Sequence, residues 1–125
     1  MKKALVVGLN SYPHGGELFA CVNDATEISK RLERNGDGSK NFDVVTITDK
    51  CSRALLKTKI DECFADNADI ALFYFAGHGY IDSFGGKIIA TDNDNADISL
   101  RDILGVVYSN NIKTVTQGIV EIAIF

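Results

Sequence analysis

A seven-residue apolar run limits the fold of this chain more than any other feature. The run is Ile70–Ala76, and the segment Gly77-His78-Gly79 follows it directly. Because the run is too short for a buried helix, it predicts a strand with both faces buried in a sheet. Strands of this kind belong to parallel sheets that helices cover on both sides. The sequence therefore predicts an α/β fold with this strand at the centre of the sheet.

Other apolar segments lie on both sides of this strand. Residues Ala4–Leu9 and Phe42–Thr48 are short and rich in β-branched side chains, as strands are. Residues Tyr80–Asp82 and Gly86–Ala90 are separated by a short turn and predict a β-hairpin. Residues Ile112–Phe125 alternate β-branched and polar side chains and predict one or two more strands.

Three segments have apolar residues at helical spacing, each after a residue that can cap a helix. We expect Asn23 or Asp24 to cap the first, Ser52 the second, and Ser99 the third, which runs through Tyr108. The order of elements predicts a three-layer sandwich, with helices on both faces of a mainly parallel sheet and the hairpin inserted after the histidine strand. The apolar positions at helical spacing in the first helix are Ala25, Ile28 and Leu32. In the second helix the expected core stripe is formed by Leu55, Leu56, Ile60, Cys63 and Phe64.

Length and composition narrow the class of protein. The chain has 125 residues, which predicts a single domain over residues 1–125. Its 13 Lys and Arg against 17 Asp and Glu give a net charge of −4. We therefore expect no nucleic-acid partner, because phosphate binding relies on a concentrated basic face. No stretch approaches the ~20 apolar residues of a membrane span, so we expect no membrane association.

The cysteines point to a reducing compartment. Cys21, Cys51 and Cys63 are odd in number and widely spaced, and no C-x-x-C pair is present. We expect a cytoplasmic location and no metal site built on these thiols. Cys51 and Cys63 are interpreted as small buried hydrophobes, whereas Cys21 lies in the loop after the first strand.

Chemistry is expected at the carboxyl ends of the strands. Two loops lie there: Asn10–Asp24 after the first strand and Gly77-His78-Gly79 after the central one. The two glycines let a substrate approach the imidazole closely and leave backbone amides unshielded. His78 is the leading candidate for a catalytic residue. The alternative is a histidine that simply ends a strand in a tight turn.

The motifs of these two loops, taken together, resemble the caspase-like cysteine peptidases, which include caspases, metacaspases and bacterial relatives. Phe73–Gly79 is similar to the histidine motif of that family, an apolar strand running into S/A-G-H-G. Ala4–Tyr12 followed by Cys21–Ala25 resembles the first strand and C-x-N-D-A segment of the metacaspase and bacterial branch. Ile89–Asp92 resembles the hairpin exit before the third helix. The resemblance covers about residues 4–108, the p20-like region of the family.

The resemblance implies a cysteine endopeptidase site and gives roles to individual residues. His78 would be the general base and acid of a Cys–His dyad, and the Gly79 amide would be one oxyanion-hole donor. Asp24 matches the acidic residue of the S1 pocket in metacaspase-type members, which implies peptide or protein substrates with Arg or Lys at the cleavage position. For Asp24 the alternative is an ordinary helix N-cap.

The nucleophile of the family has no counterpart in this sequence. Its D-x-C-x-S/A-G segment should fall around Thr114–Phe125, and no cysteine follows Cys63. A Cys–His mechanism needs a thiolate within reach of His78. The family does not use the cysteine at the position of Cys21 as its nucleophile, so Cys21 is only an unconventional candidate thiol. We therefore expect an inactive domain, either a truncated or frame-shifted product that is incomplete at its C-terminal end or a natural pseudoenzyme.

Two other function classes stay open on the sequence. One is a flavodoxin-like or Rossmann-like nucleotide-binding module, although Gly8, Gly15 and Gly16 do not form G-x-G-x-x-G. The other is a non-catalytic regulatory partner of an intact caspase-like peptidase, pairing through a sheet edge as a homo- or heterodimer.

We expect no cofactor. Asp92–Asp97 is similar to the start of an EF-hand loop but lacks its turn glycine, and Ile103 stands where the bidentate Glu should be. Metacaspases are commonly calcium-activated, yet their calcium carboxylates cannot be matched here, so we interpret this segment as a solvated acidic loop. His14 is interpreted as a loop histidine near the cleft and not as a ligand.

Overall fold

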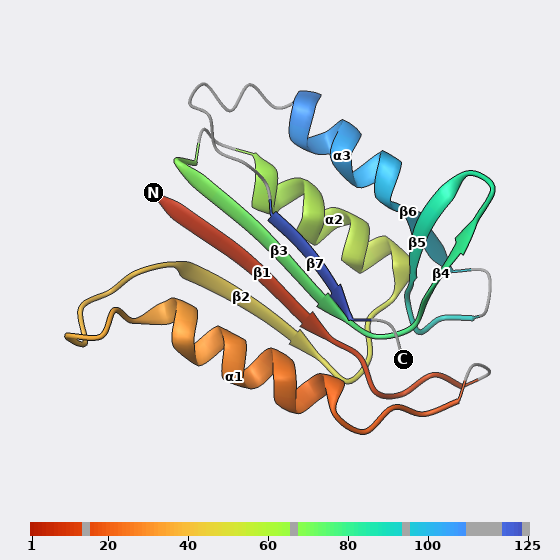
Figure 1. Ribbon diagram of the computed structural model, residues 1–125, viewed down its shortest axis with the longest axis horizontal. Helices are drawn as coiled ribbons and strands as arrows, with labels where there is room; N and C mark the ends of the chain where they lie inside the picture. Colours follow the sequence, from red (N-terminus) through yellow and green to blue (C-terminus); the bar gives the residue numbers. More distant parts are fainter. Residues whose placement is uncertain (14–15, 66–67, 94–95, 110–118, 124–125) are drawn as a thin grey trace.

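A parallel four-stranded sheet forms the middle layer of the molecule (Figure 1). The computed structural model describes residues 1–13, 16–65, 68–93, 96–109 and 119–123, the last of these as backbone only. Across the sheet the strands follow the order β2-β1-β3-β7, and each neighbouring pair is parallel. The strands are β1 (Lys2–Gly8), β2 (Asp43–Thr48), β3 (Ile70–Ala76) and β7 (Ile119–Ala123).

Helices cover both faces of this sheet. Helix α1 (Cys21–Glu33) lies on one face, and α2 (Arg53–Phe64) and α3 (Leu100–Ser109) lie on the other (Figure 1). Side chains alternate along β1, so that Leu5 packs in the core under α2 and α3 while Val6 packs in the core under α1. The predicted three-layer α/β sandwich is therefore confirmed. The apolar run at residues 70–76 forms an interior strand, as expected.

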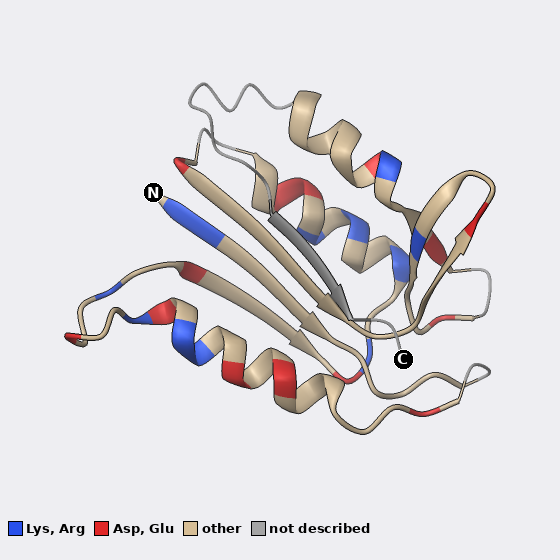
Figure 2. Ribbon diagram, viewed as in Figure 1, with Lys and Arg blue, Asp and Glu red and all other residues tan. Residues whose placement is uncertain are grey.

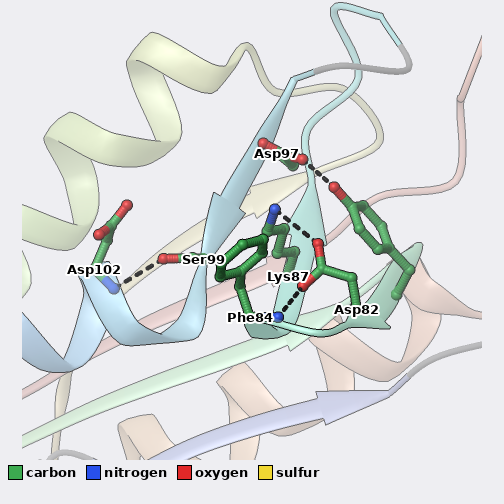
Figure 3. A network of polar contacts seen from close by, with 7 residues as sticks. Asp82, Phe84, Lys87, Asp97, Ser99 and Asp102 are labelled. Atoms are coloured by element: carbon green, nitrogen blue, oxygen red, sulfur yellow. Dashed lines mark hydrogen bonds and ion pairs between the residues drawn. The ribbon is translucent and has the colours of Figure 1, made fainter.

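A smaller antiparallel sheet follows the histidine strand. Strands β4 (Gly79–Asp82) and β5 (Gly85–Ile89) form the predicted hairpin, and β6 (Asp97–Ser99) pairs with β5. The sequence did not predict β6, because three residues are too few to show an alternating pattern. Polar contacts fix this sheet on its outer face (Figure 3): Asp82 accepts from Lys87 Nζ at 3.0 Å and from the Phe84 amide at 2.8 Å, and the Tyr80 hydroxyl donates to Asp97.

The predicted caps hold for two helices and fail for the first. The Ser52 hydroxyl accepts from the Leu55 amide at 3.1 Å, and the Ser99 hydroxyl accepts from the Asp102 amide at 3.0 Å. Helix α1, however, begins at Cys21, so neither Asn23 nor Asp24 caps it. Its cap is instead the side chain of Asn10, whose Oδ1 accepts from the amides of Cys21 and Val22 at 3.1 and 3.3 Å.

One predicted core position of α2 is wrong. Leu55 is 42% exposed, whereas the other four predicted positions of α2 are buried. Leu55 lies in the first turn of the helix, and its neighbour Leu56 occupies the core-facing side there.

Two further features concern surface and charge. Among the described residues, no helix combines the length and apolar character that a bilayer crossing requires. Helices α1 and α2 each carry both basic and acidic side chains (Figure 2), and in α2 the basic residues precede the acidic ones.

Candidate functional site

Strands β1 and β3 end at the same edge of the sheet, where the two predicted loops begin. Gly8, the last residue of β1, pairs with Ala76, the last residue of β3. A Cβ on Gly8 would lie 2.2 Å from the carbonyl oxygen of Cys21. The glycine therefore allows the start of α1 to pack directly against the end of β1. The loop after β1 and the segment that carries His78 are neighbours as a result.

Backbone and side-chain bonds fix the loop after β1. The Leu9 amide donates to the Ala76 carbonyl at 2.9 Å. The Ser11 hydroxyl donates to Asp49 Oδ1 at 2.7 Å, just after β2, where the Asp49 backbone is left-handed with φ 74°. The Asn10 carbonyl accepts from the Leu18 amide at 2.9 Å, across the base of the loop. The loop is thus attached to β2, to β3 and to α1.

The imidazole of His78 is held by this loop. Its Nε2 lies 2.7 Å from the carbonyl oxygen of Gly16. Because a carbonyl oxygen can only accept a hydrogen bond, Nε2 carries the proton, and the neutral ring then has its lone pair on Nδ1. No described residue hydrogen-bonds Nδ1. An imidazole with this tautomer can take a proton at Nδ1 and return it, which is what a general base and acid does.

Tyr12 contacts the same histidine through both its ring and its hydroxyl. The two rings meet edge to face, with centroids 4.5 Å apart. The Tyr12 hydroxyl accepts from the His78 backbone amide at 3.1 Å and donates to the Ile89 carbonyl at 2.7 Å. Burial raises the pKa of Tyr12, which keeps the hydroxyl protonated and able to donate.

Gly79, Asp24 and Cys21, the other candidates from the sequence, lie on elements that begin near this edge of the sheet. Gly79 begins β4 and pairs with Ile88. Asp24 lies half-buried in the first turn of α1. Cys21 is the first residue of α1 and is 0% exposed, packed in the core under that helix. Within the described residues, no hydrogen bond or ion pair joins His78 to Asp24 or to Cys21.

The surroundings of Cys21 disfavour a thiolate. Burial raises the pKa of this thiol, and the negative charge of Asp24 raises it further. Cys51 and Cys63 are also buried, as predicted, and burial raises the pKa of each to about 11. Reactive cysteines have the opposite environment, with positive charge nearby and access to solvent.

Comparison with known proteins identifies the family. The model of the caspase domain, peptidase family C14, matches residues 1–125. The chain belongs to the caspase-domain family. It is 30% identical over 105 residues to metacaspase-1 of Mycosarcoma maydis and to metacaspase-1A of Neurospora crassa, matches that cover 77% of this chain and 24% and 22% of those proteins. It is 33% identical over 85 residues to metacaspase-4 of Arabidopsis thaliana, covering 62% of this chain and 20% of that protein. The chain thus spans about a quarter or less of the length of these relatives.

The family assignment does not favour the nucleotide-binding alternative, and the start of α1 gives a physical reason. Nucleotide-binding α/β domains commonly place a phosphate on the first amides of the helix that follows the first strand. In this caspase domain the amides of Cys21 and Val22 are already bonded to Asn10.

Sequence reasoning missed three residues that build the site: Tyr12, Gly16 and Asn10. In the sequence, Tyr12 and Asn10 stand only within a strand-and-turn motif, and Gly16 stands in a glycine pattern that does not match G-x-G-x-x-G. The one local signal was the aromatic side chain of Tyr12 among the turn residues that directly follow a buried strand. This signal is weak, because Phe19 in the same loop is also aromatic and is 86% exposed.

Several predictions fall outside the described residues. His14 and Gly15 are among them, as are residues 94–95 of the acidic loop and most of the segment Thr114–Phe125. Of that segment, β7 is described as backbone and lies beside β3. No group of three or more His, Cys, Asp or Glu side chains that could hold a metal ion occurs among the residues that the structure describes.

Proposed function

We propose that this caspase domain carries the histidine half of a cysteine endopeptidase site and that these 125 residues alone do not hydrolyse peptides. The observation that carries the proposal is the contact between His78 Nε2 and the Gly16 carbonyl at 2.7 Å. It leaves Nδ1 as the basic atom of the ring at the carboxyl edge of the sheet.

His78 has two tasks in such a site. It takes the proton of a cysteine thiol, so that the thiolate attacks the peptide carbonyl carbon and forms an acyl-enzyme. It then gives that proton to the leaving amine. In the second half of the reaction, His78 takes a proton from water, the water oxygen attacks the acyl carbon, and the proton returns to the departing cysteine sulfur. The Gly79 amide follows the histidine directly and is proposed as one donor to the oxyanion.

Asp24 is proposed to select basic residues at the cleavage position. It is half-buried in the first turn of α1, near the loop that holds His78. A carboxylate in this environment can form a charge-assisted bond with a substrate Arg or Lys. The N-cap alternative for Asp24 is not available, because Asn10 caps α1.

The proposed inactivity follows from the cysteines that are present. All three are buried, and burial raises the pKa of each thiol. None is bonded to His78 among the described residues. A thiolate next to Nδ1 is required for the first step, and none of these side chains supplies one.

The first test is a peptidase assay on the purified 125-residue protein, with fluorogenic peptides that end in Arg or Lys at the cleavage position. We expect no turnover above buffer, with or without calcium. Turnover that survives Cys21→Ala would overturn the proposed inactivity. Turnover that is lost in both Cys21→Ala and His78→Ala would make Cys21 the nucleophile and would overturn the same point.

The second test measures substrate recognition without catalysis. A peptide ending in Arg is titrated into the labelled protein and followed by NMR, with a peptide ending in Asp as the comparison. We expect Asp24→Asn to weaken binding of the Arg peptide about tenfold, the effect of losing one charge-assisted hydrogen bond. The matched control is Glu27→Gln on the exposed side of the same helix, which should leave the affinity unchanged. Equal effects of the two variants would contradict the role of Asp24.

A further inference from the structure

Tyr12, in the loop after β1, contacts both the backbone and the ring of His78. No role in the proposed peptidase chemistry has yet been given to this residue. Tyr12 is 5% exposed and lies within the core that α2 and α3 cover. Its ring packs edge to face against the imidazole at 4.5 Å. Its hydroxyl is part of the hydrogen bonding of the backbone on both sides of the site.

The hydroxyl completes a closed ring of three hydrogen bonds. The His78 amide donates to the Tyr12 hydroxyl at 3.1 Å, and the hydroxyl donates to the Ile89 carbonyl at 2.7 Å. The Ile89 amide in turn donates to the His78 carbonyl at 3.0 Å. Both backbone groups of His78 are therefore tied to the end of β5, one directly and one through Tyr12.

Gly77, the residue before the histidine, leaves space for this hydroxyl because it has no side chain. A Cβ built on Gly77 would lie 2.5 Å from the Tyr12 hydroxyl oxygen and 2.8 Å from the ring of Phe75. Any larger residue would have to displace one of these aromatic side chains. Gly77 thus has a steric role that is separate from access of substrate.

Residues of the loop after β1 contact both the backbone and the imidazole of His78. Tyr12 contacts the backbone and the ring of His78, and Gly16 accepts the hydrogen bond from Nε2. We propose that Tyr12 is a positioning residue that fixes the backbone and ring of His78 in the orientation in which Nε2 donates to Gly16. The inference rests on the proposed function, because it matters for catalysis only if His78 is the base.

The test compares the wild-type chain with Tyr12→Phe, which keeps the ring contact and removes both hydroxyl bonds. NMR measures solvent exchange of the His78 backbone amide and of its Nε2 proton, with His14→Gln used to assign the ring signals. We expect both exchange rates at His78 to rise about 2- to 10-fold, the size of one hydrogen bond. The amide of Val6, buried in the middle of β1, reports global unfolding and should rise less.

Two further variants sharpen the test. Gly77→Ala places a methyl group 2.5 Å from the position of the Tyr12 hydroxyl oxygen, so it should displace the hydroxyl and also increase exchange at His78. Tyr108→Phe changes a tyrosine that is 81% exposed and should leave His78 unaffected. The proposal is overturned if exchange at His78 is unchanged in Tyr12→Phe, or if it rises only as much as exchange at Val6, since Tyr12 would then be a general core residue.

The outcome is independent of the peptidase assay because no substrate is present. Selective loosening of His78 in a protein that never binds an Arg peptide would uphold the positioning role and count against the proposed function. If the Arg peptide binds through Asp24 while exchange at His78 is unchanged in Tyr12→Phe, the proposed function is supported and the positioning role of Tyr12 is overturned.

Discussion

At the scale of single residues, the cysteines show how burial decides chemistry. Cys51 and Cys63 are 2% and 5% exposed, and burial is the main cause that raises the pKa of each thiol from 9.0 to about 11. Near Cys51 the charge of Asp92 adds to the effect, whereas near Cys63 the charge of Lys3 opposes it. These thiols act as core side chains, and their protonation is linked to folding.

The raised thiol pKa values predict a loss of stability in alkaline solution. Unfolded thiols ionise near pH 9, while the folded thiols of Cys51 and Cys63 keep their protons to about pH 11. The unfolded state therefore releases protons first, and the free energy of unfolding should fall as the pH rises from about 9 to about 11. Urea unfolding at a series of pH values measures this.

A variant separates this effect from that of lysines and tyrosines that titrate in the same range. Cys51→Ala removes one of the two thiols, so its stability should decline less steeply than that of the wild type over the same pH interval. Parallel profiles for the two proteins would show that Cys51 does not contribute.

At the scale of elements, the start of α1 differs from the starts of the other two helices. Ser52 and Ser99 each stand immediately before their helix, which is why the sequence predicted them correctly. The cap of α1 comes from Asn10, eleven residues before Cys21. A cap at that distance leaves no local pattern, and the nearby Asn23 and Asp24 offered a plausible but wrong choice.

Replacing the remote cap should destabilise the protein. Asn10→Ala removes the acceptor for two amides at the start of α1, and we expect the free energy of unfolding to fall by about 1 kcal/mol. The control is Asn23→Ala, which lies exposed inside the helix and should change stability by less than about 0.5 kcal/mol. Urea denaturation of both variants decides between the two residues. A larger loss in Asn23→Ala would contradict the cap assignment.

At the scale of the whole molecule, the sequence allowed the architecture to be predicted but not the full environment of the site. The continuous apolar runs in β1 and β3 carry the information for a sheet buried on both faces. The position of His78 at the end of β3 followed from the same reasoning. The roles of Tyr12 and Gly16 did not, because their contacts with His78 span 66 and 62 residues and depend on how two strands pair.

The parallel pairing of β1 with β3 also has a consequence for the order of folding. The two strands are far apart in the chain. Each contact of His78 with the loop after β1 therefore needs residues 62 or 66 positions apart to come together. Neither the Tyr12 bond nor the Gly16 bond can form in a fragment that lacks either strand. We therefore expect the contacts of His78 with Tyr12 and Gly16 to form only once β1 has paired with β3, and any opening that parts these strands removes both contacts together.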